Sequence, residues 1–195
     1  FIGGMLQHFS RLQDEDVSPG EYLKFAREPE HKELAKAYQK YEELKIKKGY
    51  MDFGDLITKT LKLFRDRSNI LKQYQKQFKY ILVDEFQDTN IAQNELIKLL
   101  AGKNGNISVV ADDDQSVYRF RGAAVSNVLA LRKDFPKTKI IVLTKNYRST
   151  QEILDRAYDL IQFNNPDRLE VVEKINKKLV AVSPTSRKAS RGDLV

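Results

Sequence analysis

The sequence has no cysteine, no tryptophan and only two histidines, His8 and His31, in 195 residues. The absence of cysteine excludes a disulfide framework and a thiolate metal site, and two histidines do not make a histidine-rich metal site. The apolar runs are only a few residues long, too short for a membrane span. The first residues have neither the basic region nor the cleavage-like site of a secretory signal peptide. We therefore expect a protein of the reducing cytosol with no membrane partner.

The composition is that of a globular protein with an excess of positive charge. Hydrophobic residues make up 41% of the chain, charged residues make up 31%, and the formal net charge is +7. A chain of this length and composition can bury a core and corresponds to about one domain. Its charge is compatible with a polyanion such as nucleic acid, but charge alone does not identify a partner.

Strand-like and helix-like segments alternate in the middle of the chain. Continuous apolar runs are typical of parallel strands that are buried on both faces. Strands separated by helices of this length predict an α/β fold with one parallel sheet and flanking helices. The expected strands are 79–83, 106–112 and 139–146, and the expected helices are 90–102, 123–135 and 149–163.

The two ends of the chain have different patterns from the middle. We expect short helices and turns in residues 1–30, followed by an amphipathic helix over 31–48. Asp52 and Asp55 suit the start of a further helix as a capping box, and we expect the same of Ser149 and Glu152. Beyond residue 166 the chain is basic and contains Pro184 and several serines, which indicates a connector.

Polar side chains follow each expected strand. Asp84 and Glu85 follow the first, residues 112–115 (Asp-Asp-Asp-Gln) follow the second, and residues 146–148 (Asn-Tyr-Arg) follow the third. Ligands of open α/β sheets bind beyond the carboxyl ends of the strands, so we expect these groups to meet at one edge. Converging carboxylates repel unless a cation lies between them, and Mg²⁺ prefers carboxylate and phosphate oxygens. The pattern predicts a magnesium–nucleotide site, although two acids can also simply cap a strand-to-helix turn.

Three segments, "VDEFQDTN", "DDDQSVYRFRGA" and "LTKNYRST", occur in this order. They resemble motifs II, III and IV of the UvrD/Rep/PcrA branch of superfamily 1 DNA helicases, and the similarity extends from "MDFGDL" to "NYRSTQEIL". The resemblance implies part of a P-loop, RecA-like 1A core over residues 51–165. It also implies that residues 1–50 are the helical end of an inserted 1B-type domain and that 166–195 lead toward a second motor domain.

The resemblance assigns ATP and Mg²⁺ chemistry to particular residues. Asp84 and Glu85 would bind the metal ion, and Glu85 would also be the base that activates the attacking water. Gln115 would sense the γ-phosphate. Arg148 would be an arginine finger on the transferred phosphoryl group, unless it forms an ordinary salt bridge at a helix start. Tyr147 would stack on the adenine ring.

The segment after Gln115 resembles the loop with which the family contacts single-stranded DNA. Tyr118 and Phe120 would stack against bases, and Arg121 would bind a phosphate, as Arg119 also could. The alternative for the aromatic residues is that one of them, Phe120 above all, belongs to the core. By the same resemblance, "DFGDL" could contact DNA, but helix capping already explains both of its aspartates.

Two features depart from the family pattern. Ala111 stands where the family usually has glycine, and we expect ordinary extended backbone there. No G-x-x-x-x-G-K-[ST] loop occurs in the sequence, and motifs V and VI are absent too. Since the chain also begins at Phe1, we expect an inactive excerpt of an ATP-dependent DNA helicase.

The resemblance extends to the partners of such a helicase. The parent would act 3′ to 5′ on single-stranded DNA and duplex junctions, in the nucleoid of the cytoplasm. The excerpt would need the rest of the helicase, namely the phosphate-loop segment and the second motor domain. Two other interpretations stay open from the residues alone: a magnesium-dependent nuclease, or a degenerate helicase domain that only binds DNA or docks.

Overall fold

The computed structural model describes residues 2–103, 105–116 and 126–182. Contacts within the chain divide it into two compact units, Phe1–Phe135 and Pro136–Val195. Among the described residues, no helix is both long enough and apolar enough to cross a membrane.

The first unit begins with helices joined by turns, as the sequence predicts. Phe9 and Leu12 pack with Tyr38 in a buried cluster, where the Phe9 and Tyr38 rings stack with their centroids 4.8 Å apart. Burial of aromatic rings is the main stabilising contribution of such a small helical cluster. The helices are α1 (Ile2–Asp14), α2 (Pro19–Phe25) and α3 (Pro29–Lys48).

Local capping sets the ends of the next helices. Asp52 and Asp55 form the expected capping box, since each side chain accepts the backbone N–H of the other residue. The helix after residue 90 ends at Gly102 as predicted, where φ is +57°, a value that favours glycine. These helices are α4 (Phe53–Asp66), α5 (Ser68–Gln77), α6 (Ile91–Ala101) and, after the gap, α7 (Ser126–Asp134).

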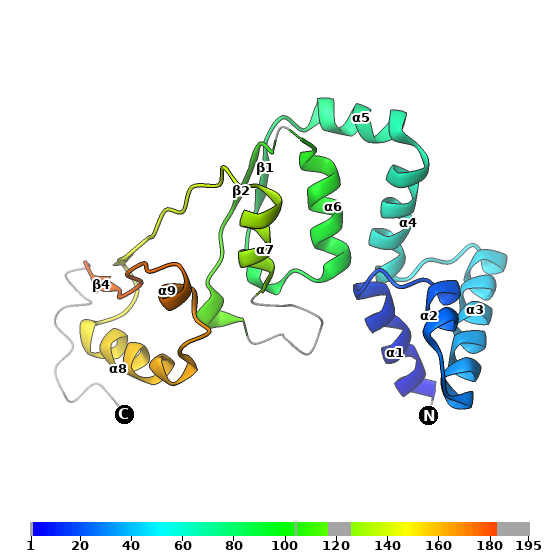
Figure 1. Ribbon diagram of the computed structural model, residues 1–195, viewed down its shortest axis with the longest axis horizontal. Helices are drawn as coiled ribbons and strands as arrows, with labels where there is room; N and C mark the ends of the chain where they lie inside the picture. The colour runs from blue at the N-terminus through cyan, green and yellow to red at the C-terminus, as the bar shows by residue number, and fades with distance from the viewer. Residues whose placement is uncertain (1, 104, 117–125, 183–195) are drawn as a thin grey trace. The chain divides into compact units, whose positions relative to one another are not determined.

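A two-stranded parallel sheet lies beside α6 (Figure 1). Strand β1 (Ile81–Val83) pairs with β2 (Ile107–Val109), with Val83 opposite Val109, which confirms parallel pairing of the first two expected strands. The expectation that both faces are buried is wrong, because Leu82 in the middle of β1 is 79% exposed. One face of this sheet is therefore uncovered by the described residues.

The third expected strand does not join this sheet. Of the expected strand 139–146, only Lys145–Asn146 form a strand, β3. This strand pairs in parallel with β4 (Val180–Ala181) within the second unit. Residues 139–144 have no strand assignment, and among them Ile141 is 81% exposed. The described residues therefore do not form a single three-stranded sheet.

The second unit is built on α8 (Gln151–Ile161). The capping box expected at Ser149 and Glu152 is wrong, because α8 starts after Thr150, whose side chain makes no capping bond. Instead, Asn146 Oδ1 accepts the N–H groups of Arg148 (2.9 Å) and Ser149 (2.8 Å). The expected connector also contains regular structure, namely β4 and the short helix α9 (Leu169–Val172).

Candidate functional site

The parallel pairing of β1 and β2 brings two of the polar groups to the same end of the sheet. The pairing continues irregularly past the strands, as Val110 N–H donates to Val83 O at 2.8 Å and Phe86 N–H donates to Val110 O at 3.0 Å. Asp84 and Glu85 therefore leave the sheet next to the loop of residues 112–115. The ends of neighbouring parallel strands are where α/β sheets bind ligands.

The turn after β1 holds its two acids outward. Phe86 is fully buried and anchors the turn, while Asp84 and Glu85 are exposed. Glu85 has a φ of +48°, a left-handed backbone conformation that is unfavourable for a residue with a side chain. Residues held in such conformations are concentrated at functional sites.

Gln87 connects this turn to the loop that follows β2. Its side chain is only 1% exposed. Its Nε2 donates to Glu85 Oε2 at 2.6 Å, and its Oε1 accepts the backbone N–H of Asp112 at 3.0 Å. The sequence does not reveal this role of Gln87, because nothing in "DEFQD" distinguishes a buried bridging glutamine from an exposed one.

The loop after β2 is organised by Asp112. Its Oδ1 accepts the N–H of Asp114 at 3.2 Å, and its Oδ2 accepts Gln115 Nε2 at 2.7 Å. Gln115 itself is exposed, in the short 3₁₀ helix Asp113–Gln115. The preceding Ala111 has no positive φ, which confirms the expectation of ordinary backbone there.

A pocket and a set of oxygen ligands lie at this end of the sheet. Asp84 and Glu85 offer exposed carboxylates, the hard ligands that Mg²⁺ prefers, so the donor set fits this ion. Residues 112–114 also bring three carboxylates within 4.8 Å of one another, but Asp112 already serves as a cap. The pocket is open, has a volume of about 410 Å³, and is lined by Val83, Asp84, Glu85, Asp88, Thr89, Gln93, Leu96 and Ile97.

The other predicted site residues belong to the second unit or fall outside the described residues. Tyr147, which is 72% exposed, and the exposed Arg148 belong to the second unit, so their meeting with Asp84 and Glu85 stays a prediction. Tyr118, Phe120 and Arg121 lie outside the described residues.

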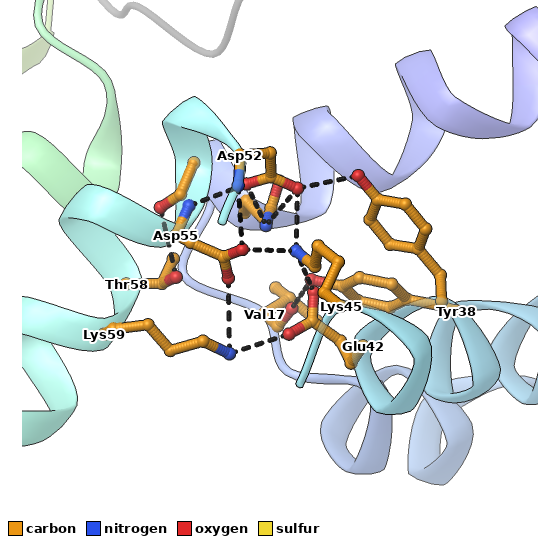
Figure 2. A network of polar contacts seen from close by, with 11 residues as sticks. Val17, Tyr38, Glu42, Lys45, Asp52, Asp55, Thr58 and Lys59 are labelled. Atoms are coloured by element: carbon orange, nitrogen blue, oxygen red, sulfur yellow. Dashed lines mark hydrogen bonds and ion pairs between the residues drawn. The ribbon is translucent and has the colours of Figure 1, made fainter. Parts of the chain in front are cut away.

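A second acidic cluster, at the junction of α3 and α4, is held by lysine (Figure 2). The Lys45 ammonium lies 2.7 Å from Glu42, 2.7 Å from Asp52 and 2.6 Å from Asp55. Lys59 approaches the same cluster from α4, at 2.7 Å from Glu42. The three carboxylates have the spacing of a metal site, but the ammonium already occupies the position between them. This network is a structural connection between α3 and α4.

Burial and charge act in opposite directions on the pKa values of this cluster. Burial alone would raise the pKa of Asp52, but Lys45, the N–H of Asp55 and the hydroxyl of Tyr41 lower it from 3.8 to about 2. Burial alone would lower the pKa of Lys45, but hydrogen bonds from its ammonium to the three carboxylates raise it above its ordinary value. Both groups therefore stay charged at neutral pH.

Asp52→Asn should reduce the acid sensitivity of the first unit. The pKa of Asp52 is lowered by folding, so its ionised form stabilises the fold above pH 3.8, and this contribution is lost as the pH falls toward 2. Because Asp52 is partly exposed, we expect a contribution of about 1 kcal/mol. The measurement is urea unfolding at pH 6 and pH 2.5, followed by the helical circular dichroism signal. If wild type and variant lost equal stability between pH 6 and pH 2.5, ionised Asp52 would not be the source of this stability.

The comparisons with known proteins place the chain in a family. Residues 3–136 match the model of the UvrD/REP helicase N-terminal domain. The chain is 39% identical over 175 residues to the "ATP-dependent DNA helicase PcrA" of Leuconostoc citreum, covering 90% of this chain and 22% of that protein. It is 43% identical over 162 residues to the "DNA helicase II" of Haemophilus influenzae, covering 83% of this chain and 22% of that protein.

A third relative, the "ATP-dependent DNA helicase PcrA" of Staphylococcus aureus, is 42% identical over 168 residues, which cover 86% of this chain and 22% of the relative. The chain thus spans about a fifth of the length of these relatives. The family model covers well over half of the chain, including both Asp84–Glu85 and Gln115. The chain therefore belongs to the UvrD/REP helicase family, within its N-terminal domain.

Proposed function

We propose that this chain is part of the motor of an ATP-dependent DNA helicase that moves along single-stranded DNA and unwinds duplex DNA. The observation that carries the proposal is the pair of parallel strands whose ends bring Asp84 and Glu85 next to the loop of Gln115. The relatives, two PcrA helicases and a DNA helicase II, support the same activity. The 3′ to 5′ direction and the nucleoid location in the cytoplasm rest on the family resemblance and stay predictions.

In this proposal the exposed acids do the chemistry of ATP hydrolysis. Asp84 and Glu85 would hold Mg²⁺, which offsets the negative charge of the phosphates. Glu85 would orient the attacking water and accept its proton. Arg148 would donate two hydrogen bonds to the transferred phosphoryl group, and Tyr147 would stack on the adenine.

Gln115 is suited to report the state of the nucleotide. Its amide bonds Asp112 in this structure and could exchange that partner for a γ-phosphate oxygen. Because a neutral amide bonds either partner without a change of charge, the exchange would move the loop with little energetic cost. Tyr118, Phe120 and Arg121, a few residues further along the chain, would carry this movement to bound single-stranded DNA.

The proposed parts of the chain are those that the resemblance implies. Residues 51–165 would belong to the RecA-like 1A core, 1–50 to the end of the inserted 1B-type segment, and 166–195 to the connector. The partners would be the phosphate-loop segment and the second motor domain. The exposed face of the β1–β2 sheet, with Leu82 79% exposed, is consistent with further chain packing there.

An ATPase assay on two proteins tests this proposal. The complete helicase should hydrolyse ATP in the presence of Mg²⁺, faster with single-stranded DNA, and should unwind a tailed duplex. The 195-residue chain alone should hydrolyse ATP negligibly, because its sequence has no loop to cradle the phosphates. A complete protein that cleaves DNA with Mg²⁺ and no ATP, or that binds DNA without ATPase activity, would contradict the proposal.

A further inference from the structure

Gln87 joins the two halves of the proposed site through a buried side chain. Its amide nitrogen bonds the carboxylate of Glu85, and its amide oxygen bonds the backbone of Asp112, 25 residues further along the chain. Both contacts have hydrogen-bonding distances, and the side chain is only 1% exposed. A buried amide with both ends used is fixed in place, since leaving either end unpaired costs free energy.

The chemistry of the two partners makes glutamine specifically suitable here. A carboxylate only accepts hydrogen bonds and a backbone N–H only donates them, so the orientation of the Gln87 amide is determined by its partners. Glutamate would place a second carboxylate against Glu85. Methionine would fill the same volume but bond neither partner.

The bridge also steadies a backbone position that is unfavourable in isolation. Glu85 has a φ of +48°, and Phe86 and Gln87, the residues next in the chain, are both fully or almost fully buried. The far end of the bridge is the N–H of Asp112, whose carboxylate in turn holds Gln115. One continuous set of hydrogen bonds thus runs from Glu85 through Gln87 and Asp112 to Gln115.

We propose that Gln87 is a positioning residue that keeps the Glu85 carboxylate in register with the loop of residues 112–115, so that hydrolysis responds to DNA bound beyond that loop. This inference rests on the proposed function. Gln87 does not touch the nucleotide in this account; it acts through Glu85 and Asp112. Its loss should therefore lower the turnover rate and the DNA response of the ATPase, and leave ATP binding nearly unchanged.

The test uses Gln87→Met and Gln87→Glu in the complete helicase. We expect kcat with saturating single-stranded DNA to fall at least about 10-fold and the KM for ATP to change less than about threefold. The ratio of the rates with and without DNA should fall at least about fivefold, which a purely structural role would not cause. Gln87→Glu keeps the shape and the acceptor for Asp112, so it isolates the contact with Glu85.

Gln13→Met is the matched control. Gln13 is also buried, and its Nε2 donates to a carboxylate, Asp52 Oδ1, at 3.1 Å, but this contact lies at the α1–α4 junction. Gln13→Met should lower the melting temperature and leave kcat and the DNA response within about twofold of wild type.

Each outcome separates this inference from the proposed function. Folded Gln87 variants with wild-type kcat and DNA response would overturn the inference alone. Loss of folding in both Gln87 variants, with Gln13→Met folded, would assign Gln87 a structural role and overturn it too. A wild-type protein without DNA-stimulated ATPase, or a fully active Glu85→Gln variant, would instead overturn the proposed function.

Discussion

Glu85→Gln in the complete protein should lower the proposed DNA-stimulated ATPase rate by about 10²- to 10⁴-fold and abolish unwinding, because the variant would lack the proposed base that activates water. The glutamine has the shape of glutamate and keeps an oxygen that can accept the bond from Gln87 Nε2, so the local fold should be retained. Binding of a fluorescent ATP analogue should stay within about threefold of wild type. Steady-state ATPase, unwinding and analogue titration measure the three effects.

A matched acid-to-amide change controls for the loss of charge. Glu95 lies on α6 in the same unit, and its carboxylate pairs with Lys98 at 3.0 Å. Glu95→Gln should leave the ATPase rate within about twofold of wild type, since partly exposed pairs contribute little. Equal activity of the two variants would show that Glu85 is not the base.

Lys45→Met should destabilise the first unit by about 3 kcal/mol. Lys45 is 7% exposed and lies between three carboxylates, of which Asp55 is 1% exposed. Methionine fills the space of the side chain but removes the ammonium that the three carboxylates share. The buried Asp55 then keeps only Lys59, at 3.2 Å, as a charged partner, and a poorly compensated buried charge is unfavourable. Urea unfolding at pH 7, followed by the helical signal, gives the free energy of unfolding.

Lys40→Met makes the same replacement in an exposed pair on the same helix. The Lys40 and Glu43 side chains are 79% and 47% exposed, although their atoms are only 2.6 Å apart. We expect no measurable change in the free energy of unfolding, because exposed ion pairs contribute little to stability. Equal losses in the free energy of unfolding for the two replacements would contradict the view that the Lys45 network stabilises the unit because it is buried.

Features set by a few neighbouring residues could be predicted from the sequence. Asp52 and Asp55 are three residues apart and cap α4 whatever the rest of the chain does. Gly102 ends α6 because its positive φ costs a glycine little. The parallel pairing of 81–83 with 107–109 was also predictable, because a helix of the right length separates the two runs.

Features that depend on distant or competing partners could not be predicted. Ser149 does not cap α8, because the helix begins one residue later, with Thr150 at the N-cap position, while Asn146 holds the preceding turn through the N–H groups of Arg148 and Ser149. The third run, 139–146, contains four consecutive apolar residues, but only its last two residues pair, and they pair with β4 from the expected connector. The Gln87 bridge depends on a contact across 25 residues, which no local pattern reveals.

The same distinction applies to the candidate site. The resemblance pointed to Asp84, Glu85 and Gln115, and the β1–β2 pairing accounts for their placement at one end of a sheet. How these side chains are held is tertiary information: the left-handed backbone of Glu85, the cap by Asp112 and the buried Gln87.

The most direct test is a structure of the complete protein with Mg²⁺, a non-hydrolysable ATP analogue and single-stranded DNA. The account predicts the metal ion at Asp84 and Glu85, and Gln115 and Arg148 in contact with the γ-phosphate. It also predicts bases stacked on Tyr118 or Phe120. A nucleotide bound elsewhere, or an Arg148 side chain that points away from a triphosphate held beside Asp84 and Glu85, would contradict the account.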